Sequence, residues 1–123
     1  MKFGYTILYV PDVAASLSFF EEAFGFTKRF FSESGDYGEL STGETTLAFA
    51  AHSLGSANLP KGYVEASSSQ NPLGVEVAFV TPSVDDAHAK AIAAGAAEIK
   101  SPESKPWGQV VSYIRCPDGT LVE

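Results

Sequence analysis

A chain of 123 residues, 45% hydrophobic and 19% charged, is expected to form a single domain over 1–123 whose core needs neither disulfides nor a structural metal. Its formal net charge of −7 and its eight scattered Lys and Arg residues exclude the clustered basic surface that nucleic acids and anionic membranes require. No apolar run approaches the roughly 20 residues that span a bilayer, and no signal-peptide pattern is seen, so a cytoplasmic location is expected.

The first half of the chain predicts one strand, one helix and three further strands. Residues 3–10 are aromatic or aliphatic, as in a buried strand. Asp12 stands where an N-cap belongs, and apolar residues then recur at helical spacing over 13–24. Gly25 can adopt the left-handed conformation that ends a helix. The strands that follow are expected at 26–33, 36–42 and 44–52.

Residues 53–72 are rich in Ser, Gly and Pro and predict a connection between two halves. A structureless connection of this length is typically a linker or a lid, and the linker is the interpretation that we favour. Tyr63 and Val64 in its middle leave room for a short segment that covers a site.

The second half repeats this order of elements. Residues 75–80 predict a strand, and Ser83 with Asp86 forms a capping-box pattern before an Ala-rich helix at 84–94. A turn at 116–119 (Cys-Pro-Asp-Gly) separates the last two of the strands that follow. Those three strands are expected at 96–100, 109–115 and 120–123.

The two halves can be aligned, and this is the most informative feature of the sequence. The aligned pairs include Tyr5 with Glu76, Pro11 with Pro82, Val13 with Val84, and Ala48 with Glu123. The alignment predicts an α+β fold of two βαβββ modules, at 3–52 and 74–123, related by a pseudo-twofold axis. Their strands are expected to form one curved, mixed, eight-stranded sheet around a cavity, with the two helices outside.

Glu76 is the first candidate site residue because it interrupts an apolar run. Strand alternation places Glu76, Ala78 and Val80 on one face, and a carboxylate on a cavity face needs a partner or a proton. We favour a pocket-lining position over plain solvent exposure.

The two histidines and the single cysteine are weaker candidates. His52 lies on the same predicted strand face as Ala48, about 13 Å beyond it, and could reach the mouth of the cavity as a ligand or base. A partly exposed residue at the strand end is the favoured interpretation. His88 is expected on the helix surface, and Cys116, with no disulfide partner, is expected to be a small structural residue.

Aromatic side chains offer a second kind of contact. Trp107 precedes a predicted strand, where its indole either plugs the core or offers a flat face for stacking, and the sequence leaves both open. Phe49, together with Phe30, Phe31 and Tyr37, is a candidate for an aromatic cavity lining.

Four short motifs occur in a set order over nearly the whole chain, residues 5–123. They are 10–13 (Val-Pro-Asp-Val), 25–26 (Gly-Phe), 106–108 (Pro-Trp-Gly) and 117–123 (Pro-Asp-Gly-Thr-Leu-Val-Glu). In this order and spacing they resemble the vicinal oxygen chelate superfamily. That superfamily includes glyoxalase I, the bleomycin and fosfomycin resistance proteins, and extradiol dioxygenases.

The resemblance implies a site made by the first and last strands of each module. The matching positions are Tyr5, Ala48, Glu76 and Glu123, and in metal-dependent members such positions hold a divalent ion. Glu76 and Glu123 fit an oxygen-rich site for Zn, Ni, Mn or Fe. Ala48 has no donor atom, and the phenol of Tyr5 is protonated at neutral pH.

Two functions follow from these residues. The leading hypothesis is a glyoxalase/bleomycin resistance-like homodimer that binds a small organic molecule in an apolar, acid-tipped cavity. Its lining residues would be Tyr5, Ala48, Phe49, His52 and Trp107. The alternative is a metal-dependent lyase, isomerase or dioxygenase, in which Glu123 or Glu76 serves as ligand or catalytic base.

Overall fold

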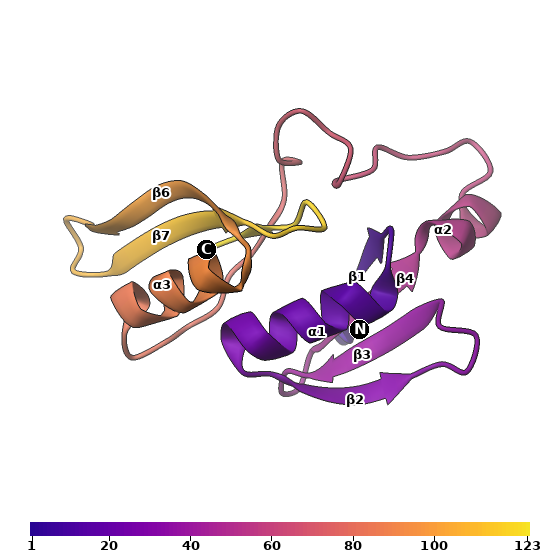
Figure 1. Cartoon of the computed structure of the whole chain (residues 1–123), viewed down its shortest axis with the longest axis horizontal. Helices are drawn as coiled ribbons and strands as arrows, with labels where there is room; N and C mark the ends of the chain where they lie inside the picture. Colours follow the sequence, from indigo (N-terminus) through magenta and orange to yellow (C-terminus); the bar gives the residue numbers. More distant parts are fainter.

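The computed structural model describes residues 1–123, and its first half forms the expected βαβββ module (Figure 1). The elements are β1 (Tyr5–Val10), α1 (Val13–Phe24), β2 (Thr27–Phe31), β3 (Tyr37–Ser41) and β4 (Thr46–Ala51). They form a sheet in the order β1-β4-β3-β2, in which β1 runs parallel to β4 and the other pairs are antiparallel.

The second half repeats this topology. Its elements are β5 (Glu76–Val77), α3 (Val84–Ala94), β6 (Ala97–Ser104), β7 (Val110–Arg115) and β8 (Leu121–Val122). The sheet order is β5-β8-β7-β6, again with the first strand parallel to the last. The α+β class and the two modules are confirmed, and both predicted helices are present. None of the helices is both long and apolar enough to cross a membrane.

The strands divide into two four-stranded sheets and do not form one continuous sheet within the chain. The two modules lie side by side, and α1 and α3 pack against each other at their junction (Figure 1). Within the chain, β1 is hydrogen-bonded only to β4, and β5 only to β8. The first strand of each module therefore keeps one free edge.

Local sequence signals fix the helix ends as predicted. The Asp12 carboxylate accepts a hydrogen bond from the Ala15 backbone N–H at 3.0 Å, and Gly25 adopts φ 75° after the last turn of α1. At the start of α3, the Ser83 hydroxyl accepts from the Asp86 backbone N–H and donates to the Asp86 carboxylate.

An aromatic cluster joins the two modules. Phe20 of α1 is fully buried, and its ring packs edge-on against Phe49 of the first sheet at 4.9 Å between centroids. Phe79, which follows β5, packs against Phe24 and Phe26 at 5.0 and 4.9 Å. The hydrophobic core therefore continues from one module into the other through α1.

The Pro-Asp-Gly motif has a structural role at the same junction. The buried Asp118 carboxylate accepts from the Ser16 hydroxyl of α1 at 2.8 Å and from the Thr120 backbone N–H at 3.0 Å. One side chain thus holds the turn before β8 and ties it to the first module. Cys116 is buried beside it, and burial raises the pKa of its thiol, which fits the structural role expected of it.

The connection between the modules contains an element that the sequence analysis missed. Residues His52–Asn58 form a short helix, α2, so that His52 begins a helix and does not end a strand. Residues 59–75 then arch from α2 to the second module, and we call this segment the strap (Figure 1). The Arg115 guanidinium donates to the carbonyls of Ala66, Ser69 and Gln70 and holds the strap there.

Candidate functional site

Each sheet has one face covered by its helix and an opposite face, which we call the open face. On the second sheet, the side chains of β7 alternate between these two faces, so Tyr113 and Arg115 both lie on the open face. Leu121 of β8 is paired with Arg115 and lies on the same face. Glu76 is the β5 neighbour of Leu121, and Glu123 lies two residues after Leu121. The register therefore places Glu76 and Glu123 on one face.

Tyr113 joins these two carboxylates and was missed by the sequence analysis. Its hydroxyl donates to Glu123 Oε2 at 2.7 Å, and this hydrogen bond is the main reason why the pKa of Tyr113 is raised. Burial and the nearby charges of Glu123 and Glu76 add to the increase. Because the charges of both carboxylates raise the pKa of the Tyr113 phenol, we treat the three groups as one cluster. Glu76 is exposed in the single chain, where a pocket-lining position was expected, and Glu123 is half-buried.

The open face of the first sheet carries a different polar network. Tyr37 of β3 donates to Glu39 at 2.9 Å, and burial together with this hydrogen bond raises the pKa of Tyr37 to about 12. Arg29 lies 3.5 Å from the Glu39 carboxylate and donates to the Thr46 hydroxyl at 3.2 Å. Tyr5, paired with Thr46 on β4, is 51% exposed at the edge of this network.

Ala48 and Phe49 point to opposite faces of β4. Ala48, opposite Ile7 of β1, is fully buried beneath larger neighbours on the open face. Phe49 is fully buried in the core against Phe20, because the alternation of the strand turns it toward α1. Phe49 is therefore a packing residue, and we correct its assignment to the ligand site.

His52 lies at the border between the first sheet and the strap. Its Nδ1 is 2.6 Å from the Tyr63 hydroxyl, and its Nε2 is 3.6 Å from the Glu65 carboxylate. The Tyr63 ring packs on Tyr9 of β1 with 5.0 Å between centroids. The sequence favoured a linker and left room for a covering segment at Tyr63 and Val64. Tyr63 does cover Tyr9, which shares the open face with Tyr5.

The two remaining candidates, Trp107 and His88, differ in burial: Trp107 is exposed and His88 is buried. Trp107 is 69% exposed in the turn between β6 and β7, where its indole N–H donates to Gln109 at 2.6 Å. It does not plug the core, and the stacking interpretation is the one that stays open. His88 is buried and not on the surface, because the face of α3 that bears Val84 and Ala91 also bears His88 and packs on the sheet.

The residues present do not make a metal centre within one chain. No group of three or more His, Cys, Asp and Glu side chains is placed to hold an ion. Glu76 and Glu123 supply carboxylates, but one Glu123 oxygen accepts a hydrogen bond from the Tyr113 hydroxyl, and Ala48 has no metal-binding atom. The site predicted from the sequence therefore lacks ligands, and we derive no reaction step through a metal.

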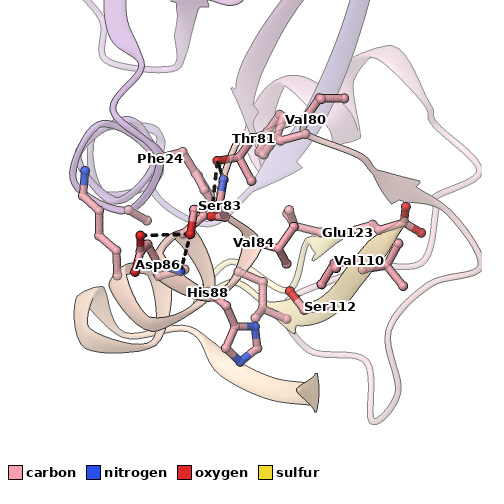
Figure 2. Close-up of a pocket in the computed structure, with 18 of the residues that line it drawn as sticks. Phe24, Val80, Thr81, Ser83, Val84, Asp86, His88, Val110, Ser112 and Glu123 are labelled. Atoms are coloured by element: carbon pink, nitrogen blue, oxygen red, sulfur yellow. Dashed lines mark hydrogen bonds between the residues drawn. The ribbon is translucent and has the colours of Figure 1, made fainter. Parts of the chain in front are cut away.

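Neither of the two main hollows contains both carboxylates. The larger, about 570 Å³, lies on the helix-covered side of the second sheet (Figure 2). The smaller, about 360 Å³, lies between the modules and is lined partly by Thr6, Phe26 and Val77. Tyr5 and Glu76, which are exposed on the open faces, lie outside both hollows.

A known family model matches this chain over nearly its whole length. The model of the Glyoxalase/Bleomycin resistance protein/Dioxygenase superfamily matches residues 2–123. The chain belongs to this superfamily. This confirms the resemblance seen in the motifs and the two βαβββ modules.

Relatives of this superfamily member are distant in sequence and close in structure. Virulence protein STM3117 of Salmonella typhimurium is 24% identical over 126 residues, covering 99% of this chain and 81% of the relative. A glyoxalase-related enzyme from Fulvimarina pelagi is 19% identical with a TM-score of 0.83, covering 99% and 85% of the two chains. A family enzyme from Burkholderia phytofirmans PsJN is 23% identical with a TM-score of 0.81, covering 99% and 95%. At this identity the solved structures establish the fold.

Proposed function

We propose that this protein binds a small organic molecule on its open faces, with Glu76 and Glu123 as the acidic contacts. The observation that carries the proposal is the cluster of Glu76, Glu123 and Tyr113 on one face of the second sheet. Carboxylates accept hydrogen bonds only, so they select a guest that presents N–H or O–H donors. Membership of the superfamily supports small-molecule binding as the class of function.

A second copy of the chain would complete this site. Large apolar side chains are exposed on or beside the first strand of each module, and a single chain leaves them uncovered. They are Phe3, Tyr5, Ile7, Val75 and Val80. The free edges of β1 and β5 lie beside these residues, and an unpaired strand edge is a template for pairing with another chain. We therefore infer a homodimer in which the open face of one protomer's first module meets the second module of its partner.

Light scattering at micromolar concentration is expected to give twice the chain mass of 13.0 kDa. Ile7→Asp should shift the protein toward the monomer, because it places a charge on the face that we expect a partner to cover. Ile99→Asp is the matched control, since Ile99 is also 47% exposed but lies on β6, at the edge of the second sheet opposite β5. A monomeric wild-type protein would contradict the inferred dimer.

Ligand binding is expected to depend on both carboxylates. Metal-free bleomycin is a suitable first probe because it is an organic cation and the superfamily includes proteins of resistance to it. Glu76→Gln and Glu123→Gln should each weaken binding about tenfold or more, since a charge-assisted hydrogen bond contributes roughly 1.5–3 kcal/mol. Titration calorimetry checks this, with Glu44→Gln as an exposed control on the loop before β4.

Two outcomes would contradict the binding proposal. One is equal affinity in Glu76→Gln, Glu123→Gln and Glu44→Gln for bleomycin and for a panel of other organic amines. The other is one stoichiometric transition metal in protein purified without added metal, lost on substitution of Glu76 or Glu123. That second result would favour the metal-dependent lyase, isomerase or dioxygenase.

A further inference from the structure

The 570 Å³ cavity lies on the opposite face of the second sheet from the proposed site. It is bounded by α3, by β7, and by residues 79–82 that lead into α3 (Figure 2). The β7 residues Val110, Val111, Ser112 and Ile114 line it, whereas Tyr113 does not. In Figure 2 the Glu123 carboxylate points away from Val84 and Ser112. The cavity therefore meets the carboxylate cluster only at Glu123, and neither Glu76 nor Tyr113 lines it.

The cavity exists because α3 presents smaller side chains to its sheet than α1 does. Leu17 and Phe20 of α1 fill the corresponding space in the first module, where both are buried. At the same distances along α3 from Val84 as these residues have from Val13, the second module has His88 and Ala91. The space left by these smaller side chains opens to solvent beside the exposed Val80. The first module is thus an internal reference in which the equivalent space is closed.

His88 adds a specific polar feature to the wall of the cavity. Its side chain is buried, and Nε2 lies 2.7 Å from a Glu98 carboxylate oxygen. A carboxylate only accepts, so Nε2 carries a proton, and Nδ1 is an acceptor when the ring is neutral. Nδ1 is enclosed and has no hydrogen-bond partner, which is costly for a buried polar atom. Figure 2 shows the imidazole below Ser112 at one end of the cavity.

We propose that this cavity is a second binding site, for a compact neutral molecule with an apolar body and one hydroxyl or N–H donor. Twelve of its twenty lining residues are hydrophobic, and its volume is within the roughly 300–1,000 Å³ of small-molecule sites. The donor would bond to His88 Nδ1 after a small tilt of the ring, which the exposed Glu98 side chain can follow. The lining includes two carboxylates, Asp86 and Glu123, and one ammonium, Lys90, so an anion is disfavoured. This site shares only Glu123 with the site proposed above, and its proposal does not rest on that function.

The test uses 2-naphthol and naphthalene, which share one ring system and differ by the hydroxyl. Fluorescence and NMR titration of the full chain are expected to show one 2-naphthol bound, with shifts at Val84, Ser112 and His88. Naphthalene should bind about tenfold more weakly, because it leaves Nδ1 unpaired. His88→Phe should bring 2-naphthol down to the affinity of naphthalene while leaving naphthalene unchanged.

A filling substitution tests the position of the site. Ala87→Leu puts a larger side chain into the cavity and should abolish binding of both probes, whereas Ala89→Leu on the exposed side of α3 should not. Thermal unfolding of both variants shows whether each is folded. Equal binding by the two variants, or shifts confined to Tyr113 and Glu76, would overturn the proposal. Loss of the dimer in Ala87→Leu but not in Ala89→Leu would also overturn the proposal, because a second copy of the chain would then occupy the cavity.

Discussion

Phe20→Ala is expected to lower the free energy of unfolding by about 3–5 kcal/mol, the usual range for removing a fully buried Phe ring. Phe20 has no exposed surface and packs edge-on against Phe19, Phe24, Phe49 and Phe79. These rings belong to both modules, so the cavity left behind would loosen the junction as well as the first core. Few other side chains in the chain have this position.

Urea denaturation followed by circular dichroism measures this effect. Phe20→Leu should lose less stability than Phe20→Ala, because it leaves a smaller cavity. Phe3→Ala is the surface control, since Phe3 is exposed, and any stability it contributes through a dimer can be removed by working at low concentration. If Phe20→Ala and Phe3→Ala changed stability equally, the continuous core between modules would be wrong.

Gly119→Ala is expected to cost roughly 3 kcal/mol or more and to displace the strap from the second module. Gly119 adopts φ 92°, a conformation that is costly for any other residue. A Cβ atom there would also collide with the backbone of Ala66 and Ser67 in the strap. The collision is with backbone atoms, which cannot move aside as a flexible side chain could.

Gly43→Ala separates the two contributions. Gly43 has nearly the same φ, 96°, but a Cβ atom at this position meets nothing. Gly43→Ala should therefore lower the free energy of unfolding by the backbone strain alone, about 1 kcal/mol. Gly119→Ala should exceed it and should also speed hydrogen exchange at residues 66–70, where Arg115 holds the strap carbonyls. Equal losses of stability, with unchanged exchange at the strap, would show that the strap yields without cost.

The sequence predicted those parts of the fold that depend on neighbouring residues. Asp12, Ser83 and Gly25 mark helix ends because they cap with groups three or four residues away. The apolar stripe over 13–24 predicted α1 for the same local reason. The alignment of the two halves then indicated the module topology that the structure confirms.

Where the sequence misled, a contact between distant segments decided the result. His88 looked like a surface residue because Asp86 and Lys90 flank it, yet α3 turns that face onto β6, where Glu98 accepts its hydrogen bond. His52 was expected at the end of a strand, but it begins α2 and pairs with Tyr63 from the strap. Glu98 and Tyr63 lie 10 and 11 residues along the chain from the histidines that they contact, so local sequence patterns do not indicate either pair.

In the candidate site, too, the sequence predicted some residues, and contacts between distant segments decided others. The repeat placed Glu76 and Glu123 on the first and last strands of the second module, but it gave no reason to include Tyr113. Its role depends on the antiparallel register of β7 with β8, which brings its hydroxyl to Glu123 across ten residues of chain. The packing of α1 on α3, which leaves the two sheets separate and both open faces exposed, is likewise a tertiary result. Periodicity within a segment determines which face of a strand or helix is apolar, whereas the partner of that face depends on packing between segments far apart in the chain.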